Sequence, residues 1–127
     1  MLKKSKPLIL STGMSTQKDI DDVIKLLNKY RKVNYCLLHC NSTYPAPFRD
    51  INLKYINKLK KYGKIVGYSG HERGVAVTLT SIGFGARIIE RHLTLDKNME
   101  GPDHAASLVK EEFRQLIRSI REIEQAL

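Results

Sequence analysis

The sequence has no tryptophan and no apolar run long enough to cross a membrane. A membrane-spanning helix needs about 20 consecutive apolar residues, whereas the run that begins at Leu8 ends at Ser11. That run is also too short for the core of a secretory signal peptide. We therefore expect a soluble, cytoplasmic protein with no membrane partner.

Cysteine is scarce, with only Cys36 and Cys40 present. If both lie in one strand, their spacing places them on the same face with Cα atoms about 13 Å apart, at ~3.3 Å per residue. That separation is beyond the reach of a disulfide, and two thiols alone do not complete a four-ligand zinc site. We expect reduced thiols in the core or in a pocket.

Acidic residues are few beside basic ones, 13 against 22, which gives a formal net charge of +9. The lysines are scattered, with one modest cluster at Lys58, Lys60, Lys61 and Lys64. Aromatic residues are not interleaved with them, as stacking platforms for nucleic acid would require. We therefore expect no nucleic-acid partner, although a basic surface favours small anionic substrates.

Four short apolar runs predict β-strands, at residues 7–11, 35–40, 65–68 and 87–92. A helical pattern follows each run, at residues 16–27, 52–62, 75–82 and 108–127. Thr16 and Asp19 resemble a capping box, and Gly63 is typical of a helix stop. In the last helix the expected core stripe is Phe113, Leu116, Ile117, Ile120 and Ile123.

Strict alternation of strands and helices predicts an α/β fold with a parallel sheet and helical crossovers. An eight-stranded (β/α)8 TIM barrel needs about 250 residues. These 127 residues form four consecutive βα units, which is half of the eight units of such a barrel. A free half barrel leaves two unpaired strand edges. The alternatives are a single partial domain over residues 1–127, a half completed by a partner, or a small open sheet.

Polar side chains collect at the carboxyl ends of the predicted strands, the edge at which parallel α/β folds bind ligands. His71 and His92 end the third and fourth strands. Adjacent strands lie about 4.8 Å apart, so their imidazoles can converge on one ion. With water and substrate oxygens they would form an open divalent-metal site that suits manganese. The alternative is that each histidine only forms hydrogen bonds in a polar loop.

The remaining polar candidates are hydroxyl, amide and carboxylate side chains in the same turns. They suit phosphate or sugar hydroxyls, or serve only as turn formers; they are Ser11, Asn41, Ser42, Tyr44, Ser69 and Asp103. We interpret His39 as a structural histidine and His104 as a solvated loop residue. Glu90 lies in an apolar strand, and we expect it to pair with an arginine or a lysine because a buried carboxylate needs a partner.

Several strings together resemble the sialic acid synthase family, that is, N-acetylneuraminate synthase and its bacterial relatives. They cover nearly the whole chain and are KPLILSTGMST (6–16), LLHCNSTYPAP (37–47), DINL (50–53), VGYSGHE (66–72), IIERHLTLDKNMEGPDHAASL (88–108) and IREIEQAL (120–127). The resemblance implies a (β/α)8 catalytic barrel that condenses phosphoenolpyruvate with N-acetylmannosamine or a related amino sugar. The implied products are a nine-carbon 2-keto acid and phosphate.

The resemblance also assigns roles to residues. It implies that His71 and His92 bind a divalent metal, Mn²⁺ or Mg²⁺, which polarises the aldehyde of the sugar. Residues matching Ser42, Tyr44 and Ser69 would line the substrate site, and Asp103 would contact the amino sugar. Where Ser42 stands some relatives carry asparagine, found here at Asn41, so both remain candidates.

In the family comparison, the chain corresponds to the second half of the barrel. The first half, with its glutamates and phosphate-binding lysines, and the C-terminal antifreeze-like domain have no counterpart in these 127 residues. We therefore expect the isolated chain to be inactive, because catalysis of this kind depends on positioned charges. The alternatives are a catalytically incompetent half barrel that keeps metal or ligand affinity, one that assembles with a complementary half or as a homodimer, or a synthase specific for legionaminate or pseudaminate precursors.

Overall fold

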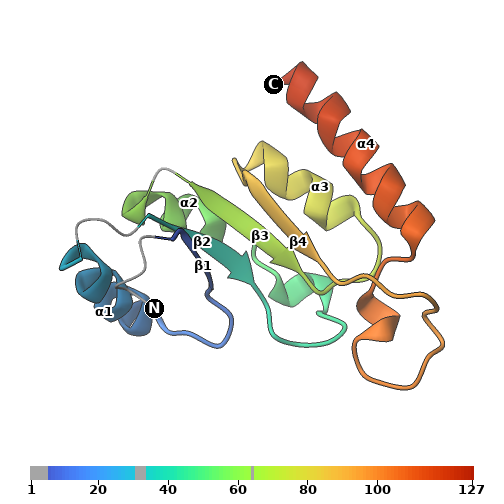
Figure 1. The fold of residues 1–127 in the computed structure, drawn as a ribbon, viewed down its shortest axis with the longest axis horizontal. Coiled ribbons are helices and arrows are strands. Elements are labelled where there is room, and N and C mark those ends of the chain that lie inside the picture. Colours follow the sequence, from blue (N-terminus) through green and yellow to red (C-terminus); the bar gives the residue numbers. More distant parts are fainter. Residues whose placement is uncertain (1–5, 31–33, 64) are drawn as a thin grey trace.

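Four parallel strands form one sheet, in a computed structural model that describes residues 6–30, 34–63 and 65–127 (Figure 1). The strands are β1 (Leu8–Ser11), β2 (Tyr35–Cys40), β3 (Val66–Gly70) and β4 (Ile88–Arg91), in the spatial order β1-β2-β3-β4. The helices α1 (Gln17–Asn28), α2 (Tyr55–Leu59), α3 (Ala76–Gly83) and α4 (Lys110–Ala126) alternate with them. The predicted α/β fold is confirmed: the sheet is one curled half of a (β/α)8 barrel.

Side chains on one face of the sheet pack against the helices. Strand residues alternate between the two faces of the sheet. Those on the helix-facing side pack in one core with Ile20, Ile24 and Leu27 of α1 and with Ile56 and Leu59 of α2. The strand residues of this core are Leu8, Leu10, Tyr35, Leu37, Val66, Tyr68 and Ile89. The alternate positions, which include Cys36 and Cys40, lie on the opposite face, where both cysteines are free and buried.

The first helix begins as the sequence predicts. Thr16 accepts a hydrogen bond from the backbone N–H of Asp19 at 3.2 Å, and the Asp19 carboxylate accepts one from the backbone N–H of Thr16 at 2.8 Å. This reciprocal pair is a capping box, which satisfies two otherwise unpaired donors. The apolar stripe of α1 then reaches the sheet, with Ile20, Ile24 and Leu27 buried.

Two helix predictions are wrong in part. Residues 52–62 do not form one helix: α2 is short and a 3-10 turn over Lys60–Tyr62 follows it. Asn52 has a φ of +48°, a left-handed conformation that an α-helix does not contain. In α4 only Leu116 of the expected stripe is buried, and Ile117 is 48% exposed. This helix lies beside α3 at the end of the row of helices (Figure 1).

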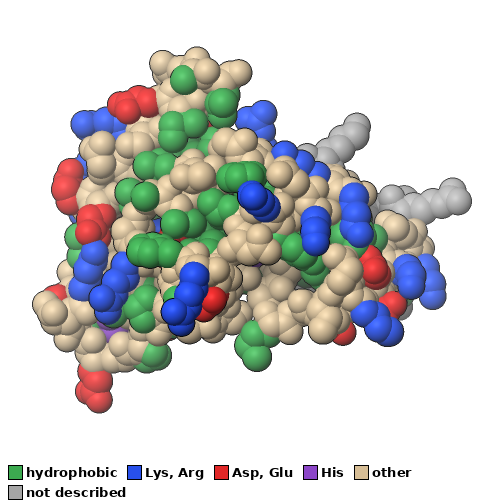
Figure 2. Space-filling model, turned by 180° about the vertical axis from the view of Figure 1, so that it is seen from behind, with side chains coloured by type: hydrophobic (Ala, Val, Ile, Leu, Met, Phe, Trp, Pro, Cys, Tyr) green, Lys and Arg blue, Asp and Glu red, His purple; other side chains and the backbone are tan. Residues whose placement is uncertain are grey.

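Basic side chains are spread over the face of the molecule in Figure 2, with acidic ones among them. They do not form one continuous basic patch on that face. Lys64, part of the lysine cluster noted in the sequence, lies outside the described residues. In the described part of the chain, no helix is both long and apolar enough to cross a bilayer.

Candidate functional site

The strands deliver polar side chains to one edge of the sheet, where β1 to β4 end. Around the ends of β3 and β4 the structure brings together Tyr44, Ser69, His71, His92 and Asp103. Asn41 and Ser42 line a neighbouring cavity at the end of β2, and Ser11 lies farther along the edge on β1. The strand-end clustering expected from the sequence is therefore observed for most of the candidates.

The two imidazoles lie against each other at the mouth of the half barrel. Their ring centroids are 5.3 Å apart, and their planes are inclined by 79°. The His71 ring is buried, and its Nδ1 lies 2.5 Å from the backbone oxygen of Asn41. Because a carbonyl oxygen only accepts, Nδ1–H is the donor, and in the neutral tautomer Nε2 then carries the lone pair.

Nε2 of His71 faces two hydroxyl groups. The Tyr44 hydroxyl lies 3.2 Å away and the Ser69 hydroxyl 3.4 Å away. Ser69 donates its hydrogen to the Glu90 carboxylate at 2.6 Å, so it has none left for His71. The Tyr44 ring also stacks on His71 at 4.2 Å and meets the edge of His92 at 5.5 Å. Tyr44 thus closes one side of the histidine pair.

The spacing of the two rings fits a shared cation. An imidazole nitrogen binds a first-row metal at about 2.1 Å, which puts the ring centroid roughly 3.2 Å from the ion. Two such rings at 90–110° would have centroids about 4.5–5.2 Å apart, close to the 5.3 Å observed between His71 and His92. Among the described residues, no group of three or more His, Cys, Asp or Glu side chains is arranged to hold a metal.

Asp103 lies near this pair, on the loop after β4. Its Oδ2 is 3.8 Å from Nδ1 of His92, which is too long for a direct hydrogen bond. The same loop holds His104, whose Nδ1 lies 2.7 Å from the Thr94 hydroxyl. Thr94 gives its own hydrogen to the Asp96 carbonyl, so His104 is the donor. His104 is therefore half-buried and anchored, and the expectation of a solvated residue is wrong.

The buried carboxylate of this region is that of Glu72, not Glu90. Glu90 is exposed and accepts a hydrogen bond from Ser69, and its expected pairing with a basic residue is not observed among the residues that the structure describes. Glu72 and Arg91 instead form an ion pair at 2.8 Å, and both side chains are 0% exposed. The sequence carried a signal for this pair. The side chains of Ile89 and Arg91 share the helix-facing side of β4, and a charge buried on that side requires a partner.

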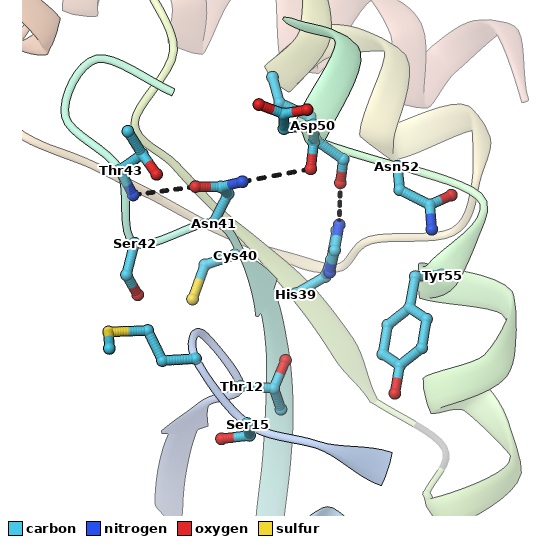
Figure 3. Close-up of a pocket in the computed structure, with 12 residues that line it drawn as sticks. Thr12, Ser15, His39, Cys40, Asn41, Ser42, Thr43, Asp50, Asn52 and Tyr55 are labelled. Atoms are coloured by element: carbon cyan, nitrogen blue, oxygen red, sulfur yellow. Dashed lines mark hydrogen bonds between the residues drawn. The ribbon is translucent and has the colours of Figure 1, made fainter. Parts of the chain in front are cut away.

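A cavity of about 590 Å³ opens beside the end of β2 (Figure 3). Asn41 uses its side-chain amide to build the turn at its rim, donating to the Asp50 carbonyl and accepting from the backbone N–H of Thr43. Ser42 also lines it, and its hydroxyl lies so close to Gly13 that a Cβ at Gly13 would collide with it. Of the two candidates Asn41 and Ser42, it is therefore Asn41 whose side chain is engaged in hydrogen bonds within the turn.

Ser11 does not join the histidine pair or this cavity. It is exposed at the end of β1 and lines a smaller space of about 130 Å³ between β1 and α1. Its proposed role in binding substrate stays a prediction, as do the ligand-binding roles of the other candidate residues.

His39 has the structural environment that the sequence predicts. Its Nε2–H donates to the Ile51 carbonyl at 2.5 Å, and the ring lies between Tyr55 and Tyr68. Burial lowers the pKa of His39 from its ordinary 6.5, and the hydrogen bond to Ile51 opposes this effect only in part. Folding therefore favours the neutral form of His39.

This shift predicts a loss of stability in mild acid. The unfolded chain takes up the proton first as pH falls, so the stabilisation from neutral His39 is complete above its unfolded pKa and is lost toward the folded one. We expect the urea midpoint to fall between about pH 7 and pH 5, and less steeply in His39→Gln. Parallel pH profiles for the two proteins would contradict the assignment.

Comparison with known proteins shows extensive similarity. The family model described as the NeuB family matches residues 1–127. The N,N'-diacetyllegionaminic acid synthase of Campylobacter jejuni is 46% identical over 128 residues, covering 98% of this chain and 38% of the relative. The N-acetylneuraminate-9-phosphate synthase of Homo sapiens is 42% identical over 130 residues, covering 98% and 35%.

A solved structure agrees with the fold. The N-acetylneuraminic acid (sialic acid) synthetase of Leptospira borgpetersenii serovar Hardjo-bovis, in complex with citrate, superposes with a TM-score of 0.91 at 31% identity. The alignment covers 98% of this chain and 44% of that one. The chain thus spans less than half the length of each of these relatives.

Proposed function

The chain belongs to the NeuB family, and from this premise we propose that it forms half of the catalytic barrel of a synthase that condenses phosphoenolpyruvate with an N-acetylated amino sugar. The products would be a nine-carbon 2-keto sugar acid and phosphate. The observation that carries the proposal is the meeting of His71 and His92, with centroids 5.3 Å apart, at the carboxyl edge of a parallel sheet. That edge is where barrels of this type bind substrates.

The histidine pair supports a divalent cation, Mn²⁺ or Mg²⁺, as the cofactor. When bound, such an ion supplies Lewis-acid polarisation of a carbonyl oxygen. His71 is prepared as a ligand because its Nδ1–H donates to Asn41, which leaves the lone pair on Nε2, the nitrogen beside the Tyr44 hydroxyl. With only two protein ligands, the site would keep positions open for water and substrate oxygens.

The remaining side chains would hold and orient the substrates. We propose that Asp103 accepts hydrogen bonds from sugar hydroxyls, since its carboxylate is half-buried beside His92. The Tyr44 ring would exclude water from one side of the pair, against which it stacks. Ser69 and Ser42 offer hydroxyls, and the exposed Ser11 suits an anionic group.

Four βα units are half of an eight-unit barrel, and we propose that the working enzyme contains a complementary half, on the same polypeptide or another. In this chain the face opposite the helices includes Ile9, which is 58% exposed. A complementary half would cover such side chains and supply the phosphate-binding cations that substrate positioning requires. We expect this chain alone to release no phosphate from phosphoenolpyruvate.

The test is phosphate release from phosphoenolpyruvate in the presence of Mn²⁺ and N-acetylmannosamine. We expect activity only after this chain is combined with the complementary half of a relative, and none when it carries His71→Ala. Diacetylated precursors of legionaminic and pseudaminic acids, assayed in parallel, would identify the sugar. Activity of this chain alone would refute the need for a second half. Inactivity of the reconstituted barrel with every sugar would refute the proposed function.

A further inference from the structure

We propose that Arg91 and Glu72 are positioning residues, whose buried ion pair sets the placement of His71 relative to His92 and fixes the loop that carries Asp103. This inference rests on the proposed function. In the chain, Glu72 directly follows His71, and Arg91 directly precedes His92. A contact between Glu72 and Arg91 therefore joins the two histidine-bearing strand ends.

The guanidinium of Arg91 binds three backbone carbonyls and so links two loops. Its Nη2 donates to the Glu72 carbonyl at 2.7 Å and to the Ala106 carbonyl at 3.1 Å. Its Nη1 donates to the Gly74 carbonyl at 2.8 Å. These acceptors lie after β3 and in the loop after β4, the loop that also holds Asp103. One side chain thus holds both loops that flank the histidine pair.

Both oxygens of the Glu72 carboxylate accept hydrogen bonds. Oε1 accepts from Arg91 at 2.8 Å and from the Thr78 hydroxyl at 2.7 Å, and Oε2 accepts from the Tyr68 hydroxyl at 2.8 Å. Burial and the neighbouring Glu72 charge raise the pKa of Tyr68, so its phenol remains a donor. The carboxylate is consequently held by side chains from strands β3 and β4 and from helix α3.

Gly70 leaves the space that this arrangement needs. A Cβ at Gly70 would come within 2.8 Å of Glu72 Oε2, 2.9 Å of Arg91 Cδ and 2.9 Å of the Tyr68 ring. Gly70 and Arg91 are register partners on β3 and β4. The absence of a side chain at Gly70 therefore allows the ion pair to lie directly against the sheet.

The position of Arg91 on β4 also determines the direction in which the His92 side chain points. Successive side chains of a strand point to opposite faces, so Arg91, anchored on the helix side, directs the next residue toward the mouth of the half barrel. A planar guanidinium with five donors can hold several carbonyls in one geometry, which an ammonium does not reproduce. Apolar residues often stabilise a core as well as a buried ion pair does. The advantage of the Glu72–Arg91 pair here is therefore that it orients the histidine-bearing strand ends.

The experiment compares Mn²⁺ binding in this chain and in folded variants, by electron paramagnetic resonance of free Mn²⁺. Thr78→Val removes a hydroxyl that touches both Glu72 and Arg91, and Arg91→Lys and Glu72→Gln change the pair itself. We expect each to weaken Mn²⁺ binding at least about tenfold, as supporting residues around metal sites do. We also expect faster hydrogen exchange at the Ser107 and Leu108 amides, because a displaced or replaced Arg91 side chain holds the Ala106 carbonyl of their loop less firmly.

Ser81→Ala is the matched control. Ser81 is another buried hydroxyl of α3, and it donates to the Thr78 carbonyl without contacting the ion pair. We expect it to lower stability while Mn²⁺ binding and loop exchange stay at the parent level. If the Thr78, Arg91 and Glu72 variants behave in the same way as Ser81→Ala, or if all three fail to fold, the pair is only structural and the proposal is overturned.

A second readout separates this proposal from the proposed function. If the parent chain does not bind Mn²⁺, or if binding survives His71→Ala and His92→Ala, the metal assignment fails. The positioning role of the ion pair is then tested without metal. The measurements are the ¹⁵N chemical shifts of the His71 and His92 imidazoles and the hydrogen exchange of the Ser107 and Leu108 amides. Shifts and exchange rates unchanged by Thr78→Val and Arg91→Lys would overturn the positioning role.

Discussion

Replacing His71 or His92 by alanine is expected to weaken Mn²⁺ binding more than about 100-fold, beyond the range found for residues that only support metal ligands. The reason is that His71 and His92 are the two imidazoles that meet at this edge, and the described residues include no group of three or more His, Cys, Asp or Glu side chains arranged to hold the ion. Removal of one ring leaves a single protein donor, and removal of both should abolish binding. The measurement is titration of the chain with Mn²⁺, followed by electron paramagnetic resonance.

The matched control for this prediction is His104→Gln. His104 is also a histidine of the loop edge, but its Nδ1–H is committed to Thr94, and it is not a member of the pair. We expect this variant to bind Mn²⁺ like the parent chain. If His71→Ala and His92→Ala also bind like the parent, the shared site is wrong. If His104→Gln loses binding as strongly, the ion is held elsewhere in the loop.

Disrupting one partner of the buried ion pair should produce the largest loss of stability. Glu72→Leu or Arg91→Met leaves an uncompensated charge at a position where both side chains are 0% exposed. Such a change costs about 3–5 kcal/mol, a large share of the roughly 5–15 kcal/mol that stabilises a typical domain. The double variant should be more stable than either single variant, because it leaves no unpaired charge. Urea unfolding of all four proteins measures the three differences.

The surface pair Arg121–Glu124 provides the control for burial. Its side chains are 70% and 37% exposed, and removal of either charge should change the free energy of unfolding by no more than about 1 kcal/mol. If the single variants of Glu72 and Arg91 cost as little as this, the pair is hydrated in solution. If the double variant equals the sum of the singles, the two side chains do not interact.

Local patterns in the sequence determined most of the fold. The run at residues 35–40 became β2 without change, and the other three strands shifted by at most two residues at either end. The capping box at Thr16 formed because both of its partners lie within one helical turn. The same local signals failed at Asn52, where a positive φ delays the second helix. Such a conformation depends on the fit of the surrounding loops, which a local pattern does not contain.

The sequence alone determined that four βα units alternate, that the strands run parallel, and that polar residues gather where the strands end. It also singled out His71 and His92, because each residue follows its own strand. Only the tertiary structure decided that the carboxylate buried beside them is Glu72 rather than Glu90, and that its partner is Arg91. These two residues are 19 positions apart, and only the pairing of β3 with β4 brings them together. Local propensity acts over a few residues, whereas burial of charge is settled by contacts between distant segments.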